Sequence, residues 1–309
     1  MNTQRIIGIA LFVIGVALIV LGAVKIAPSG TTSVGASLCF FGILLAAFSF
    51  IRRPEPGPDA PPPMSPAQRL LGMFYEPTRV FQNLRAYPRW LAPLLVIGVL
   101  AAAYTFAFER RVTPEAIGNK MADKIIEGGW VPEGAQAEFR EQQIEGFTAP
   151  MARVGKVINA FVGTFAFAAF LAGIYLLGAL VFGGRINFWQ GLAVALHAML
   201  PVVVIQRLLS LLLLYIKPVE SINLILDQGG MVKDNLGVIF SPAEHPVLFA
   251  AGSTIGLLSF YGVWLGAKGL RHGGERVSSS AAWSISIGLW LLGFLIATGS
   301  AVLFPQFLS

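Results

Sequence analysis

The chain has 309 residues, of which 55% are hydrophobic and only 12% charged, and its mean hydropathy is +0.71. Soluble domains carry about a quarter of charged residues, so this composition excludes a large soluble domain. The formal net charge is +6, but the basic residues lie mostly in short loops beside apolar stretches, which indicates anionic headgroups and no nucleic acid as partner. The single cysteine, Cys39, excludes a disulfide framework and a cysteine-rich metal site.

Seven apolar stretches are each long enough for a membrane-spanning helix, which needs about 20 apolar residues. They cover residues 6–24, 34–51, 90–108, 157–181, 188–216, 247–267 and 281–304. The first stretch exceeds the core of a cleaved signal peptide, which is about 7 to 15 residues long, so we expect it to remain as the first span. The sequence therefore predicts an all-α, polytopic transmembrane helical bundle.

The first two stretches predict an N-terminal transmembrane hairpin over residues 1–51, closed by a short turn at residues 28–30. The following segment, residues 52–68, contains the run RRPEPGPDAPPPMSP. Such a proline density favours a semi-rigid, extended linker over a packed element. This cytoplasmic linker is predicted to separate the hairpin from a five-span body over residues 69–309.

An amphipathic pattern opens the body. Apolar residues that share one helical face are Leu70, Phe74, Pro77, Phe81 and Leu84. The basic residues that fall mainly outside this stripe are Arg69, Arg79, Arg85 and Arg89. The pattern predicts a helix or helix pair in the cytoplasmic membrane interface, restarted at Pro77. The alternative is a helix packed on the end of the bundle.

The loop over residues 109–156 mixes both signs of charge with apolar residues at helical spacing. Glycines and a proline at residues 128–132 predict two short helices separated by a break. Neither this loop nor the loop over residues 217–245 contains a phosphate-binding glycine loop or a metal-ligand spacing. We therefore interpret both as connecting segments on the outer side.

The fifth stretch carries Arg207, the one unambiguous charge inside an apolar span. Residues 188–216 would form a helix about 43 Å long, against a hydrocarbon core about 30 Å thick, so the helix either tilts or breaks at Pro201. Arg207 is then either an anchor near the headgroups or part of a ligand pathway or inter-helix contact.

Three further polar residues lie on this stretch. Gln190 and His197 are seven residues apart and share one helical face, and Gln206 follows further along. Such a stripe either lines a water-filled path or makes hydrogen bonds between helices.

Four glycines in the sixth stretch form small-xxx-small pairs, which allow close approach of a neighbouring backbone. They are Gly252, Gly256, Gly262 and Gly266. We interpret them as helix contacts within the chain, with a homo-oligomer or another membrane protein as the alternative.

The distribution of charge predicts the orientation. Lys and Arg exceed acidic residues at the N-terminus, in residues 52–89, at Arg185 and in residues 268–276, whereas the alternate loops lack this excess apart from Lys25. The positive-inside rule then places the N-terminus in the cytoplasm and the C-terminus outside, in a multi-pass protein of the cell (inner) membrane.

Signatures of enzymes are absent from the sequence. It contains no HExxH zinc helix, no GxSxG nucleophile turn, no P-loop and no pair of aspartates within the spans. We therefore predict no catalytic, cofactor-binding or metal-binding residues.

Two segments resemble the bacterial branch of the Yip1 domain family. The first, GMFYEPTRVFQNLRAYPRWLAPLLV, has a proline, an aromatic residue four positions on and a second proline before a span. The second, LLSFYGVWLGAKGLRHGGERVSSSAAWSISIGLWLLGFLIATG, is similar to the last two spans of that family and includes Phe260, Trp264 and Trp290. The resemblance covers the chain from about Leu70 onward.

This resemblance implies a five-helix membrane bundle with its N-terminal side in the cytoplasm and its C-terminus across the membrane. Eukaryotic relatives act in vesicle trafficking with small GTPases, through a cytosolic N-terminal region. The present chain has a two-span hairpin and a linker there, so GTPase binding is not carried over. The family supplies no catalytic residues.

The sequence leaves two hypotheses for function. The first is a non-enzymatic scaffold or membrane-organisation factor that acts by helix packing and interfacial contact. The alternative is a small-solute transporter or channel with a polar path along the fifth span. Against the alternative, the spans lack the carboxylate that usually couples transport to protons or cations.

Overall fold

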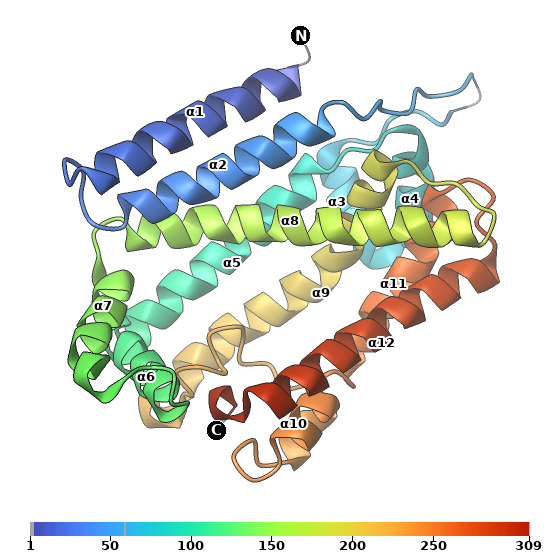
Figure 1. Ribbon diagram of the computed structural model, residues 1–309. Coiled ribbons are helices and arrows are strands. Elements are labelled where there is room, and N and C mark those ends of the chain that lie inside the picture. The colour runs from blue at the N-terminus through green and yellow to red at the C-terminus, as the bar shows by residue number, and fades with distance from the viewer. Residues whose placement is uncertain (1–2, 59, 309) are drawn as a thin grey trace.

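The protein is described by a computed structural model that covers residues 3–58 and 60–308, and throughout these residues its regular elements are helices. Within them, six helices are long and apolar enough to cross a membrane (Figure 1). They are α1 (Thr3–Ala23), α2 (Thr31–Phe48), α5 (Leu91–Val112), α8 (Ala152–Val181), α9 (Phe188–Ile216) and α12 (Ser279–Leu303). The all-α, polytopic membrane architecture is confirmed. Helix α9 continues through Pro201 without a break.

The predicted count of seven spans is not confirmed, because the sixth stretch is divided into α10 (Pro246–Ser253) and α11 (Leu257–Gly273). A distant segment bonds to the backbone at the break. The Leu236 amide donates to the Ile255 carbonyl at 3.0 Å, and Asn235 forms an isolated bridge with Gly256. The backbone groups freed by the break therefore have partners outside the helix.

The N-terminal hairpin is packed through glycines that recur every seven residues. A Cβ atom on Gly15 would lie 2.6 Å from the carbonyl oxygen of Gly35, and a Cβ on Gly35 would lie 2.6 Å from that of Gly15. Gly8 and Gly42 show the same reciprocal approach. Only glycine allows backbones this close, so these positions set the distance between α1 and α2. The other side of α2 packs on α8.

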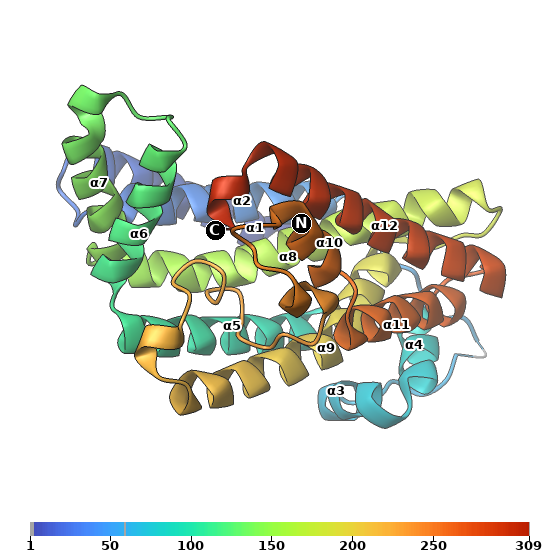
Figure 2. The same cartoon turned by 90° about the horizontal axis from the view of Figure 1, so that it is seen from below.

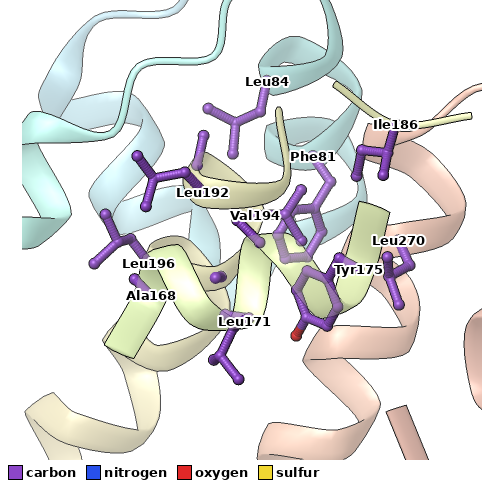
Figure 3. Close-up of a cluster of buried hydrophobic side chains, with 14 of the residues drawn as sticks. Phe81, Leu84, Ala168, Leu171, Tyr175, Ile186, Leu192, Val194, Leu196 and Leu270 are labelled. Carbon is purple, nitrogen blue, oxygen red and sulfur yellow. The ribbon is translucent and has the colours of Figure 1, made fainter. Parts of the chain in front are cut away.

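The first half of α9 is the centre of the core. Residues 188–201 are buried apart from Met199, and helices α5, α8 and α11 pack around them. Figure 3 shows Phe81 beside Val194 of α9, with Tyr175 of α8 and Leu270 of α11 close by. The helix begins with a capping box, in which the Asn187 side chain accepts from backbone N–H groups and Gln190 bonds back to the Asn187 amide.

Two pairs of short helices cover opposite ends of the bundle (Figure 2). At one end lie α3 (Pro66–Tyr75) and α4 (Pro77–Ala86), beside the last residues of α2 and α11 and the first of α9 and α12; we call it the basic end. At the other, the loop end, lie α6 (Pro114–Glu127) and α7 (Gln136–Thr148). Both predicted helix pairs are thus present, with breaks at Pro77 and at residues 128–135.

Four single-turn 3₁₀ helices complete the fold: η1 (Glu133–Ala135), η2 (Val219–Ser221), η3 (Leu236–Ile239) and η4 (Pro305–Phe307). The loop that contains η2 and η3 joins α9 to α10, and η3 packs against α10. At the chain end, η4 packs on α6, where the Trp130 ring contacts Phe304 and Phe307.

Candidate functional site

The proline-rich linker is held against the basic end at both of its ends. At its start, the Trp189 indole donates to the Ile51 carbonyl at 2.9 Å and the Asn187 side chain donates to the Arg52 carbonyl at 3.1 Å. At its finish, the Asn83 side chain bonds to the Pro62 carbonyl and the Met64 amide. These bonds fix where the basic residues of the linker lie.

Three arginines lie near one another at the basic end, one of them in the linker. We call Arg53, Arg69 and Arg89 the basic cluster. The Arg53 guanidinium lies over the Trp189 ring, 5.0 Å from its centroid. Burial, followed by the nearby charge of Arg89, lowers the pKa of both Arg53 and Arg69. The charge of Arg89 therefore lies close enough to repel the charges of Arg53 and Arg69.

No carboxylate in the described residues lies within ion-pair distance of this cluster. Arg53 donates to the Gln4 side-chain oxygen at 3.1 Å. Arg69 is only 6% exposed. A guanidinium so deeply placed is costly unless an anion or hydrogen-bond acceptors compensate it. The basic cluster is therefore suited to an external anion.

The four arginines predicted at the interface divide into two kinds. Arg79 pairs with Glu76 at 3.1 Å and Arg85 with Glu275 at 3.8 Å, both on the exposed surface. Arg89 is the exposed member of the basic cluster. The predicted position of Arg69 is corrected, because this residue lies on the buried side of α3 and not outside the apolar stripe.

The apolar stripe is corrected as well. Phe74, expected to share one helical face with Phe81 and Leu84, is instead exposed together with Leu71 and Tyr75, which are 62% and 68% exposed. The buried face of the helix pair instead includes Met73, Val80, Phe81 and Leu84. Helix α3 therefore presents an apolar edge away from the bundle.

Arg69 reaches the interior near His197, which was predicted as a separate intramembrane residue. The His197 side chain is fully buried, and its Nδ1 lies 2.8 Å from the Ala193 carbonyl oxygen. Its Nε2 has no partner among the described residues, and Arg69 acts on it electrostatically. The packing of α3 on α9 brings these two groups together.

The other polar residues of α9 have separate roles. Gln190 donates to the Arg85 carbonyl at 2.7 Å and thereby joins α9 to α4. Arg207, near the loop end, donates to the Gly229 carbonyl at 2.7 Å and lies over the Tyr104 ring. Gln206 faces the same loop at Gly230. The described cavities include none of Gln190, His197, Gln206 and Arg207 in their walls.

The four glycines of the sixth stretch face other parts of the same chain. Side chains on Gly252 or Gly256 would meet the backbone of residues 234–237, so these two glycines admit the η3 segment and not a neighbouring span. Gly262 and Gly266 instead line a cavity between α8, α9, α11 and α12.

Sequence reasoning missed Arg53, Trp189 and this cavity. A signal for Arg53 existed, because the Arg52–Arg53 pair directly follows an apolar span. The part of the chain that the structure describes has no group of three or more His, Cys, Asp or Glu residues placed to hold a metal ion.

The family model of the Yip1 domain matches residues 71–300. The match begins within α3 and ends within α12, so it includes the whole bundle around α9 and leaves out the α1–α2 hairpin and the linker. The search of curated proteins and the search of solved structures each gave no match. Because the matched region is well over half of the sequence, the chain belongs to the Yip1 domain family.

Proposed function

We propose that this integral membrane protein is a non-enzymatic scaffold or membrane-organisation factor whose basic cluster holds an anionic lipid headgroup. The observation that carries the proposal is the group Arg53, Arg69 and Arg89, which lacks a described counter-ion although Arg69 is buried. A phosphate oxygen accepts strong, charge-assisted hydrogen bonds from guanidinium groups, often two at a time.

The surroundings of the cluster support a lipid as the source of the phosphate. Leu71, Phe74 and Tyr75 form an exposed apolar edge on the same helix that carries Arg69. A helix with an apolar edge and a basic side lies well at the boundary between headgroups and acyl chains. The edge would enter the acyl region while the arginines meet the headgroups.

The orientation that we propose follows the loop charges. The basic end would face the cytoplasm and Ser309 the outside, in the cell (inner) membrane. The cytoplasmic leaflet carries the anionic lipids that attract basic segments. The orientation and the headgroup site thus require the same leaflet.

Lipid retention tests the headgroup site. The protein would be purified in a mild detergent, titrated with phosphatidylglycerol or phosphatidylcholine, and analysed by native mass spectrometry. Arg69→Gln and the more exposed Arg89→Gln should each weaken binding of phosphatidylglycerol about tenfold or more, since hydrogen bonds to charged groups contribute about 1.5–3 kcal/mol. Arg79→Gln is the matched control, because Arg79 is already paired with Glu76.

Unchanged phosphatidylglycerol binding by Arg89→Gln, with the elution profile of the unmodified protein, would reject the site. Equal losses in Arg79→Gln and Arg89→Gln would show that only the overall charge matters. The scaffold role has its own test, which is cross-linking in membranes and imaging of membrane shape on overexpression. Recovery of lipid without a protein partner, together with unaltered membranes, would contradict that role.

Small-solute transport is the second candidate, and the interruption between α10 and α11 favours it because broken helices often line binding sites. The contacts of Gln190 and Arg207 oppose it, since each binds a backbone carbonyl at a different end of α9. Solute flux into liposomes would be compared for the unmodified protein, Arg207→Leu and His197→Ala. Flux that neither change reduces removes this candidate.

A further inference from the structure

A cavity of about 450 Å³ lies between α8, α9, α11 and α12. Its volume falls in the range of about 300–1,000 Å³ that is usual for pockets that bind small molecules. The wall is mostly apolar and includes Phe170 of α8, Val202 of α9, Gly262 of α11 and Trp290 of α12. Apart from a few polar groups, this lining suits a hydrocarbon ligand.

Two hydroxyl groups approach one spot on this wall. A Cβ atom on Gly266 would lie 3.2 Å from both the Ser286 Oγ and the Tyr175 hydroxyl oxygen. Both residues line the cavity, from α12 and α8. Because Gly266 has no side chain, the two hydroxyl groups lie together at this part of the wall.

Ser286 has an unused hydrogen-bonding group. The residue is 4% exposed, and its Oγ has no partner among the described residues. Other hydroxyls in the long helices bond to the carbonyl four residues earlier, as Thr105, Thr164 and Thr298 do. A buried hydroxyl without a partner costs free energy, so a ligand acceptor at this position would be favourable.

The polar spot and the apolar part of the cavity lie at different depths. Ser286 is seven residues from the start of α12, which is about 10 Å along a helix at 1.5 Å per residue. Tyr175 lies six residues before the end of α8, so both are near the basic end. From there the wall continues along α12 through Trp290 to Ile296.

The cavity is open to the side of the bundle. In Figure 1, helices α8 and α12 approach each other at the basic end and diverge away from it, and in Figure 2 the two helices cross. The wall residues Phe170, Leu292 and Ile296 are also exposed on the outer surface, which faces lipid in a membrane. An acyl chain can therefore enter without crossing the protein.

We propose that this cavity binds one acyl chain of a glycerolipid from the leaflet at the basic end. The ester carbonyl accepts a hydrogen bond from Tyr175 and, when the enclosed Ser286 side chain turns toward the cavity, from Ser286. The chain extends past Trp290 toward Ile296. An ester carbonyl fits because it accepts hydrogen bonds and has no proton of its own to place. This site uses none of the basic-cluster residues, so it stands independently of the headgroup site.

Photo-labelling in vesicles tests the proposal. The probe is ester-linked phosphatidylcholine with a diazirine in one acyl chain. It is diluted into ether-linked phosphatidylcholine, which lacks the ester carbonyl and so competes weakly for the site, and whose neutral headgroup avoids the basic cluster. Labelling of Met199 and Trp290 should saturate as the fraction of probe rises, because both line the cavity. Labelling of Leu291, which is exposed on the outer surface, should rise in proportion to the probe.

A cavity-filling variant provides the first comparison. Gly262→Leu should lower the labelling of Met199 at least tenfold, and it should fold because a Cβ there meets only Val202 at 3.8 Å. Gly288→Leu is the matched control, since Gly288 is exposed on α12 with open space around it. Proportional labelling of Met199, or equal labelling of Met199 in the two variants, would overturn the proposal.

A second comparison tests the carbonyl. Ser286→Ala should raise the half-saturating fraction of the ester probe about three- to tenfold, as expected for the loss of one hydrogen bond. An ether-linked probe should bind the unmodified protein correspondingly more weakly and be insensitive to Ser286→Ala. Equal saturation by ether and ester probes would overturn the carbonyl contact. Arg89→Gln should leave all these values unchanged, which separates this site from the headgroup site.

Discussion

A carboxylate from the preceding loop caps the helix that follows the break between α10 and α11, and removing it gives a quantitative prediction. Asp234 Oδ2 accepts a hydrogen bond from the Leu258 amide at 2.7 Å, in the first turn of α11. The Asp234 carbonyl accepts a longer bond from the Leu257 amide at 3.4 Å. Asp234 thus caps a helix from a segment more than twenty residues earlier in the chain.

Asp234→Ala removes both the acceptor and the charge. Loss of a capping side chain costs about 1 kcal/mol, and loss of a negative charge at a helix N-terminus costs about 0.3–1 kcal/mol more. We therefore expect a decrease of about 1.3–2 kcal/mol in the free energy of unfolding. Asp234→Asn keeps an acceptor, so it should cost only the smaller amount that belongs to the charge.

Unfolding of the purified protein in mixed micelles, followed by tryptophan fluorescence as the fraction of denaturing detergent rises, would measure these differences. Hydrogen exchange at the Leu258 amide would show where the change occurs, with faster exchange in Asp234→Ala. Glu244→Ala is the control, because Glu244 is an exposed acid of the same loop, and its cost should be below about 0.5 kcal/mol. The capping role would be refuted if Asp234→Ala and Glu244→Ala were equally stable.

Two further predictions concern the N-terminal hairpin and the loop that joins α9 to α10. Gly15→Leu places a Cβ 2.6 Å from the Gly35 carbonyl oxygen and should destabilise the protein by about 1–3 kcal/mol in the same unfolding assay. Gly163→Leu is the control, because Gly163 has open space around it on α8 and its replacement should not destabilise the protein. Equal effects of the two changes would contradict the glycine contact. Arg207→Leu loses the hydrogen bond to the Gly229 carbonyl in the loop between α9 and α10. Trypsin should therefore cleave the detergent-solubilised variant after Lys233 several-fold faster than the unmodified protein. Unchanged cleavage would show that Arg207 does not anchor this loop.

The spans that follow from length and composition were predictable from the sequence. An uninterrupted apolar run must satisfy its own backbone groups in lipid, so a helix is the available structure. The break at residues 254–256 was not predictable in the same way. Residues 247–267 form one apolar run, and the partners that stabilise the interruption, Asp234 and Leu236, come from the preceding loop.

The candidate site was predictable in its parts and not in its arrangement. Arg69 was recognisable as a basic residue of an amphipathic helix, and His197 was recognisable as a polar residue within the apolar fifth stretch. Periodicity assigns faces from the average polarity around one helix, and it assigned Arg69 to the wrong face because the neighbour of α3 is the start of α9. That neighbour lies more than a hundred residues further along the chain.

The attachment of the linker to α9 has a consequence for shortened forms of the protein. Trp189 and Asn187, at the head of the most deeply enclosed helix, donate to carbonyls of Ile51 and Arg52, which precede the family-matched region. A chain trimmed to residues 71–300 would expose these two donors and uncover the side of α8 that α2 now shields. The N-terminal hairpin thus forms one wall of this molecule, and studies of the family-matched region need the hairpin and the linker as well.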